Sequence, residues 1–298
     1  MRDREAVAMG AAPITAGLDG SPESLAAAHW AAAEADRRQV DLCLLHAWVL
    51  LSPDAPGSLA GNDQNYWAKR IVHTAETEIH QRYPRLPVVE ELVAETPVTA
   101  LLRAAEDSSM VVLGSRGLGT VGSFFLGDVG LRVAGTAGRP VVLVRTGTDG
   151  ERVPSPRGGE VVAAVSLHGP CRNLLEFAFA AAAARGAPLR VLHTRTLPGQ
   201  VYTPWGVDPD VSRDIAQDAG RELAEALRPW RDEHPEVRVT ETVRLESPAR
   251  AVVRAAKRAG LLVIGRRGPR RTPAPRLGPV AHACAHHAAC PVAVVPED

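Results

Sequence analysis

Short apolar runs alternate along the chain with longer segments whose apolar residues recur at helical spacing. Residues 14–18, 42–46, 110–113 and 140–144 are apolar at nearly every position, and a further strand is expected near 88–93. Consecutive apolar positions predict strands buried on both faces, which requires helices on either side of a mainly parallel sheet. With right-handed crossovers, this order predicts an α/β fold of the doubly wound type.

Start signals for helices stand between these runs. Ser21 can cap a helix whose first turn holds Pro22 and Glu23, and this helix is expected to extend to about Arg37. A polar helix is expected from about residue 65 to 83, and a third begins after Thr96 with proline at its first position. Ser247 and Pro248 repeat that last signal later in the chain.

The apolar pattern and its turn residues occur twice along the chain. Late landmarks of the first half recur 151 positions further on, whereas early landmarks recur 147 positions further on. The four-residue difference predicts an insertion in the segment after the second strand of the second half. The recurring pairs are Gly114 and Gly265, Gly117 and Gly268, Gly127 and Gly278, Pro97 and Pro248, Pro140 and Pro291, Ile14 and Val161, and His46 and His193.

Two copies of one domain account for this repeat. A chain of 298 residues is long enough for two hydrophobic cores. We expect a first domain over 1–146, a linker over 147–159 that is rich in glycine, proline and charge, and a second domain over 160–298.

Composition and charge narrow the class of protein. Hydrophobic residues make up 45% and the 34 basic side chains equal the 34 acidic ones, so nothing in the total charge requires nucleic acid or a membrane surface as partner. No stretch approaches the roughly 20 apolar residues of a membrane-spanning helix. The four cysteines form no CxxC pair or dense framework, which is typical of a reducing compartment. A cytoplasmic protein is expected.

The glycine spacing resembles that of a known family. Both halves contain a strand, Gly-x2-Gly-x9-Gly, a helix, a proline and an apolar strand, and the first half opens with Leu18-Asp19-Gly20-Ser21-Pro22. This arrangement resembles the universal stress protein family in a tandem, two-domain form, and the likeness spans nearly the whole chain. It implies two Rossmann-like domains with five-stranded, mainly parallel sheets. It also implies pairing of the domains or of two chains through the last strand and, in some members, ATP at the strand ends.

The resemblance also indicates where a nucleotide would bind. In nucleotide-binding members the residue matching Asp19 meets the nucleoside, the residue matching Ala47 lies near adenine, and the glycine loop with the next helix start holds the phosphates. Glycine amides and a helix N-terminus both favour phosphate. The implied positions are Asp19, Ala47, Gly114, Gly117, Gly127 and Asp128 in the first half, and Ser166, Thr194, Gly265, Gly268, Gly278 and Pro279 in the second.

Both halves depart from the pattern of nucleotide-binding members, which place serine or threonine after the third glycine. Asp128 and Pro279 occupy that position here. A carboxylate at a helix start opposes phosphate by about 4 kcal/mol when the charges lie about 4 Å apart near a surface. A bridging Mg²⁺ would reverse this repulsion, because aspartate is a good magnesium ligand. Proline removes one backbone donor.

The second half departs further, because Ser166 replaces the carboxylate of Asp19. Its loop over residues 266–276 is rich in arginine, which would either bind phosphate by charge or form a solvated, proline-stiffened loop.

Three functions follow from these features. The first is a non-catalytic regulatory protein of the stress response whose first domain binds ATP or another adenine nucleotide. The second is a ligand-free scaffold, and the third is weak ATP hydrolysis, for which no base or water-positioning residue is evident. Neither a nucleophile elbow nor a P-loop occurs. His46 and His193 are expected to be structural, and His282, His286 and Cys290 lie on too many helical turns to meet at one metal ion.

Overall fold

The computed structural model of the chain describes residues 11–48, 60–115, 128–146, 159–169, 171–197, 202–203, 206–267 and 277–297. These residues fall into two compact units, one ending at Thr146 and the other following it. The predicted domain boundaries and linker fall at 146–160, of which 147–158 lie outside the described residues. Within the described ranges, no helix combines the length and the apolar character needed to cross a lipid bilayer.

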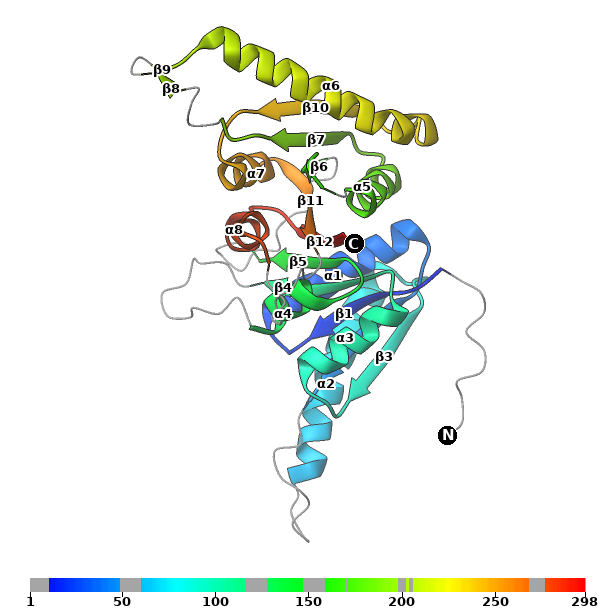
Figure 1. Cartoon of the computed structure of the whole chain (residues 1–298). Coiled ribbons are helices and arrows are strands. Elements are labelled where there is room, and N and C mark those ends of the chain that lie inside the picture. The colour runs from blue at the N-terminus through cyan, green and yellow to red at the C-terminus, as the bar shows by residue number, and fades with distance from the viewer. Residues whose placement is uncertain are drawn as a thin grey trace. The chain divides into compact units, whose positions relative to one another are not determined.

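The first unit has a parallel sheet of five strands in the order β5-β4-β1-β2-β3. Helices α1 and α2 cover one face of this sheet, and α3 and α4 cover the other (Figure 1). The doubly wound fold expected from the apolar runs is confirmed. Its elements are β1 (Ile14–Leu18), α1 (Pro22–Arg38), β2 (Leu42–Ala47), α2 (Ala60–Arg82), β3 (Val88–Val93), α3 (Pro97–Asp107), β4 (Met110–Ser115), α4 (Asp128–Thr136) and β5 (Val141–Arg145).

The second unit repeats this topology with five parallel strands in the order β12-β11-β6-β7-β10. Helices α5 and α6 pack on one face, and α7 and α8 on the other. The elements are β6 (Glu160–Val165), α5 (Arg172–Arg185), β7 (Leu189–Thr194), β8 (Tyr202–Thr203), β9 (Gly206–Val207), α6 (Pro209–Glu233), β10 (Val239–Arg244), α7 (Pro248–Ala256), β11 (Ala259–Arg267), α8 (Pro279–His287) and β12 (Val292–Glu297).

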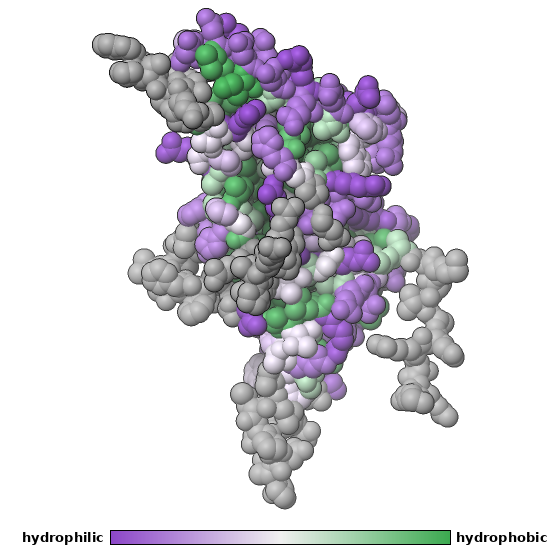
Figure 2. Space-filling model, viewed as in Figure 1, coloured by the Kyte–Doolittle hydropathy of each residue, from purple (hydrophilic) through white to green (hydrophobic). Residues whose placement is uncertain are grey.

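Burial follows the apolar pattern in both units. The central strands are buried along most of their length, because helices cover both of their faces. The outer helix α6 buries only a narrow stripe spaced four residues apart, Ala219, Leu223 and Leu227. Hydrophilic residues predominate over its outer side in the face shown by Figure 2.

Helix ends explain several element boundaries. Ser21 is the N-cap of α1, and its side chain accepts a hydrogen bond from the Ser24 N–H, as predicted. Thr96 and Ser247 do stand before Pro97 and Pro248, but neither makes a side-chain cap bond to its helix. Proline at the first position supplies the start signal in those two helices.

The four-residue insertion lies where the offset between the halves predicted it, between β7 and β10. Helix α6 has 25 residues and α2 has 23, and the preceding segment of the second unit contains the short antiparallel pair β8 and β9. A second difference was not predicted. Helix α5 has 14 residues where α1 has 17, so its N-cap, Cys171, comes after a longer turn than the one that ends at Ser21.

Candidate functional site

The carboxyl ends of β1, β2 and β4 meet at one edge of the first sheet. Leu18 lies beside His46, and Gly17 beside Leu113, in the parallel register. The residues that follow therefore share this edge. The structure thus brings together Asp19, Ala47, Gly114 and Ser115, the first three of which the family resemblance implied as site positions.

The turn from β1 to α1 fixes the orientation of Asp19. Its Oδ1 accepts hydrogen bonds from the backbone N–H of Ser21, at 2.9 Å, and from the Ser21 hydroxyl. The Asp19 N–H in turn donates to Ser24 Oγ at 3.3 Å. Asp19 is exposed, so this network presents an oriented carboxylate at the solvent side of the sheet edge.

Two matched histidines join neighbouring strands at this edge in each unit. Nδ1 of His46 donates to the Leu18 carbonyl at 2.8 Å, and Nδ1 of His193 donates to the Val165 carbonyl at 3.2 Å. Burial lowers the pKa of His193, with the Val165 hydrogen bond acting in the opposite direction. Both imidazoles therefore have the structural role predicted from their equivalent positions.

Gly114 allows close approach between β4 and the start of α1. A Cβ at this position would lie 2.5 Å from the Glu23 carbonyl carbon and 2.6 Å from the Ser24 nitrogen. No real side chain tolerates such distances to backbone. Gly265 is looser, because its Cβ would meet only side-chain atoms, those of Leu174 and Glu297, at 3.3 Å. The first glycine of each motif thus packs a helix against the sheet, tightly in the first unit alone.

Ser115 ends β4 with a buried hydroxyl. Ser115 is 2% exposed, and its Oγ has no hydrogen-bond partner among the residues that the structure describes. Adjacent residues of a strand point to opposite faces, so Ser115 faces the layer of α3 and α4 while Gly114 faces α1. An unsatisfied buried hydroxyl is costly, and a polar ligand at this edge would satisfy it.

The equivalent edge of the second unit is occupied by the chain's own charges. Glu297, at the end of β12, is 4% exposed, and its Oε1 accepts a hydrogen bond of 2.6 Å from the Leu174 N–H. That amide belongs to the first turn of α5. A carboxylate of the protein itself therefore sits at a helix start that favours anions.

Two arginines, Arg266 and Arg267, also distinguish the second sheet edge from the first. Arg267 Nη2 donates to Ser166 Oγ at 3.3 Å, and its guanidinium lies 2.7 Å from where a Cβ of Gly169 would be. Arg266 is buried at the position that corresponds to Ser115. Ser166 therefore accepts a hydrogen bond from an arginine, whereas Asp19, at the equivalent position, accepts hydrogen bonds from Ser21, the N-cap of α1.

The predicted phosphate loops are described only at their ends. Gly117, Gly127 and Gly268 lie outside the described residues, as do the arginines at 270, 271 and 276. Asp128 is the first residue of α4, and Pro279 is the first residue of α8 with Gly278 as N-cap. Both units therefore start a helix directly after the third glycine. Thr194 ends β7 at the place that Ala47 takes in β2.

Sequence reasoning missed the charged residues of the second edge. Applying the 151-residue offset one position further would have aligned Ser115 with Arg266 and Thr146 with Glu297. Both replacements turn a small polar residue into a charged one. The offset between the halves would have revealed these two charged residues, but the apolar runs used to define the strands end before positions 266 and 297.

Three of the four cysteine thiols, those of Cys43, Cys171 and Cys284, are not activated for chemistry. Burial raises the pKa of Cys43 and of Cys284 to about 12, and burial followed by the Glu297 carboxylate raises the pKa of Cys171. A thiol with a raised pKa is a poor nucleophile. The ring centroids of His282 and His286 lie 4.4 Å apart on α8, with the rings tilted by 41°, and Cys290 follows after the helix has ended at His287.

Comparison with known proteins gives one family. The model of the Universal stress protein family matches residues 11–145 and again residues 159–296. A universal stress protein of Mycobacterium tuberculosis strain H37Rv is 32% identical over 288 residues, which cover 94% of this chain and 96% of that protein.

A solved structure of nearly the same length has the same fold. The crystal structure of a universal stress protein from Archaeoglobus fulgidus superposes with a TM-score of 0.69 at 16% identity, covering 96% of this chain and 98% of the other. A universal stress protein solved in complex with cAMP covers 45% of this chain and 98% of its own, with 25% identity and a TM-score of 0.36.

Proposed function

The chain belongs to the universal stress protein family, and from this premise we propose that it is a non-catalytic regulatory protein of the stress response whose first unit binds an adenine nucleotide. The nucleotide binds at the carboxyl edge of β1, β2 and β4. The nucleoside faces Asp19 and Ala47, and the phosphates face the loop between β4 and α4.

The contrast between the two sheet edges carries this proposal. The first edge has an exposed, oriented carboxylate in Asp19 and a buried, unsatisfied hydroxyl in Ser115. The second edge has Arg267 on Ser166 and Glu297 on the start of α5. Among the described residues of the first edge, the Ser115 hydroxyl has no hydrogen-bond partner, whereas at the second edge Arg267 and Glu297 bond to groups of their own unit.

The charge of Asp128 decides how the phosphates bind. Its backbone begins α4, where helix amides favour an anion, but its carboxylate has the wrong sign. Mg²⁺ between Asp128 and the phosphates would remove this conflict, since both are hard oxygen ligands. We therefore propose the magnesium complex of ATP, rather than free ATP, as the form that binds.

Calorimetric titration of the full chain with ATP and Mg²⁺ tests the proposal, with Asp19→Ala and Ser166→Ala as a matched pair at equivalent positions. Asp19→Ala should abolish the heat of binding, and Ser166→Ala should leave it unchanged. Titrations with AMP and cAMP then define how much of the phosphate chain is recognised. No heat at millimolar concentrations of any of these nucleotides would remove the ligand from the proposal.

A ligand-free scaffold is the second candidate function, and the paired charges of the second unit favour it for that half. Asp128, Pro279 and Ser166 would then mark two sites that have both lost their ligand. Protein purified without added nucleotide separates the two functions. Stoichiometric nucleotide released on denaturation supports binding, and its absence together with a silent titration supports the scaffold.

The absence of catalysis is a proposal that rests on the sequence, which contains neither a nucleophile elbow nor a P-loop. Phosphate release far above background that is lost in Asp19→Ala would refute it.

We also propose that the two units pair through β5 and β12, and that two chains pair with one another. The family resemblance supports this, as does the position of β5 and β12, each of which forms an edge of its own unit's sheet. Cysteine cross-linking between the two strands and sedimentation of the whole chain test these two points.

A further inference from the structure

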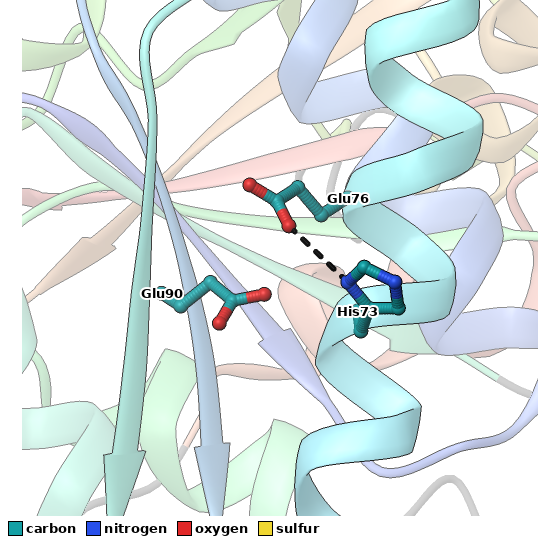
Figure 3. Close-up of side chains that lie close together, drawn as sticks. All are labelled: His73, Glu76 and Glu90. Atoms are coloured by element: carbon teal, nitrogen blue, oxygen red, sulfur yellow. Dashed lines mark ion pairs between the residues drawn. The ribbon is translucent and has the colours of Figure 1, made fainter.

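His73, Glu76 and Glu90 gather at the surface between α2 and β3 of the first unit, away from the sheet edge described above. Each offers one ligand atom, and the three atoms lie within 4.8 Å of one another. Figure 3 shows the imidazole of His73 and the carboxyl groups of Glu76 and Glu90 pointing into the same space. His73 and Glu76 extend from the helix, and Glu90 extends from the strand. His73 Nδ1 is 3.6 Å from Glu76 Oε2.

The helix supplies two of the three groups through its periodicity. His73 and Glu76 are three residues apart on α2, so they lie on one face. Zinc holds nitrogen and oxygen ligands about 2 Å away, which places the ligand atoms of a tetrahedral site about 3.4 Å apart. The first pair already has that spacing, and Glu90 closes the remaining distance by rotating an exposed side chain.

The equivalent surface of the second unit, between α6 and β10, does not have the same three side chains. Glu241 on β10 is the counterpart of Glu90, and Arg231 on α6 neutralises it at 2.7 Å. Leu227, which is fully buried, replaces Glu76. The first unit thus has a carboxylate and an imidazole, Glu76 and His73, where the second unit has Leu227 and Ala224.

Two carboxylates in contact need a positive charge. In the described part of the chain, no ion pair joins Glu76 or Glu90 to lysine or arginine, and Glu76 lies within ion-pair distance of His73 and His80. The ligand oxygens of Glu76 and Glu90 lie within 4.8 Å of each other, so two like charges face one another. A divalent cation would relieve this repulsion and use all three groups as ligands.

The geometry points to a surface site for one divalent transition-metal ion, of the Zn²⁺ class, held by His73, Glu76 and Glu90. An imidazole with two carboxylates is the donor set of such ions, whereas Mg²⁺ prefers oxygen ligands alone. Water completes the coordination, because the side chains are at the surface. The ion would fix α2 to β3 in the first unit only.

Zinc titration of the full chain by calorimetry tests the site, with every variant made in a His282→Ala background. That background breaks the neighbouring pair His282 and His286 on α8, which would otherwise offer zinc a second site. His73→Ala and Glu90→Gln should each weaken zinc affinity at least about tenfold, the loss that follows even from removing residues that only support a metal ligand.

His80→Ala is the matched control, because His80 is on the same helix and lies 3.9 Å from Glu76 Oε1 but is not among the three mutually close groups. Its zinc affinity should stay within about threefold of the background protein. Zinc should also raise the melting temperature of the background protein and of His80→Ala, but not of His73→Ala. Equal affinities of His73→Ala and His80→Ala, or no zinc binding at all, would overturn the assignment.

Discussion

Adding one methyl group to the first glycine of each motif should destabilise the first unit and leave the stability of the second nearly unchanged. In Gly114→Ala the new Cβ would lie 2.5 Å from the Glu23 carbonyl carbon, whereas carbon atoms in good contact lie about 3.5 Å apart. The start of α1 must therefore move by about 1 Å. Because the clash is with backbone, no side-chain rotation relieves it.

The size of the effect follows from two opposing contributions. Overpacking costs up to about 3 kcal/mol, and replacing glycine by alanine returns about 0.4–1 kcal/mol by restricting the unfolded chain. Gly114→Ala should thus lose about 2 kcal/mol of unfolding free energy. In Gly265→Ala the Cβ would meet the Leu174 and Glu297 side chains at 3.3 Å, which need to yield only a few tenths of an ångström. Its stability should stay within about 0.5 kcal/mol of the parent chain.

Thermal unfolding and amide hydrogen exchange measure these differences. A loss of 2 kcal/mol corresponds to a fall of about 4–8 °C in the melting temperature of a unit of this size. In Gly114→Ala the amides of Ser24 and Leu25, which bond to Ser21 in the first turn of α1, should exchange faster. Equal destabilisation by both substitutions, or unchanged exchange at these amides, would refute the packing role of Gly114.

Three further predictions concern charged groups. Glu297→Gln keeps the shape of the side chain but removes the charge at the start of α5, so the urea midpoint should report a loss of about 1 kcal/mol. The pKa of His193 is lower in the folded protein than the usual value of about 6.5, so its contribution to stability is present above that pH and is lost as the pH falls toward the native pKa. His193→Gln, whose amide can still donate to Val165, should therefore flatten the decline in melting temperature below pH 6.5. Asp128→Ser should tighten the binding of ATP without Mg²⁺ about tenfold or more, and an unchanged affinity would contradict the repulsion argument.

Strands and helices were predictable because burial on both faces leaves a strong apolar signal. The expected bounds of β1 and β3 match the structure, and α1 ends one residue later than expected. Helix α2 begins at Ala60 rather than near residue 65, because its first turn has no apolar periodicity to mark it. The repeat gave the topology of the second unit directly from the first.

The site was less predictable because its polar residues extend the strands beyond the apolar runs. The sequence pattern ends β11 at Ile264, yet Arg266 and Arg267 remain in register with Pro296 and Glu297 of β12. A criterion based on hydrophobicity stops where the functional edge begins. The hydrogen bond from the Leu174 amide to Glu297 joins residues 123 positions apart, so local pattern cannot reveal it.

The differences between the two edges are coupled and therefore unlike random loss of a site. Arg267 binds Ser166, which stands where the first unit has the carboxylate of Asp19, and Glu297 accepts a hydrogen bond from the Leu174 N–H at the start of α5. Both charged residues of the second edge thus bind groups of their own unit. If the second edge had only decayed, buried charge without compensation would have destabilised the fold. The second unit has instead replaced the interactions of a ligand with interactions of its own, which predicts that it remains folded and stable without nucleotide.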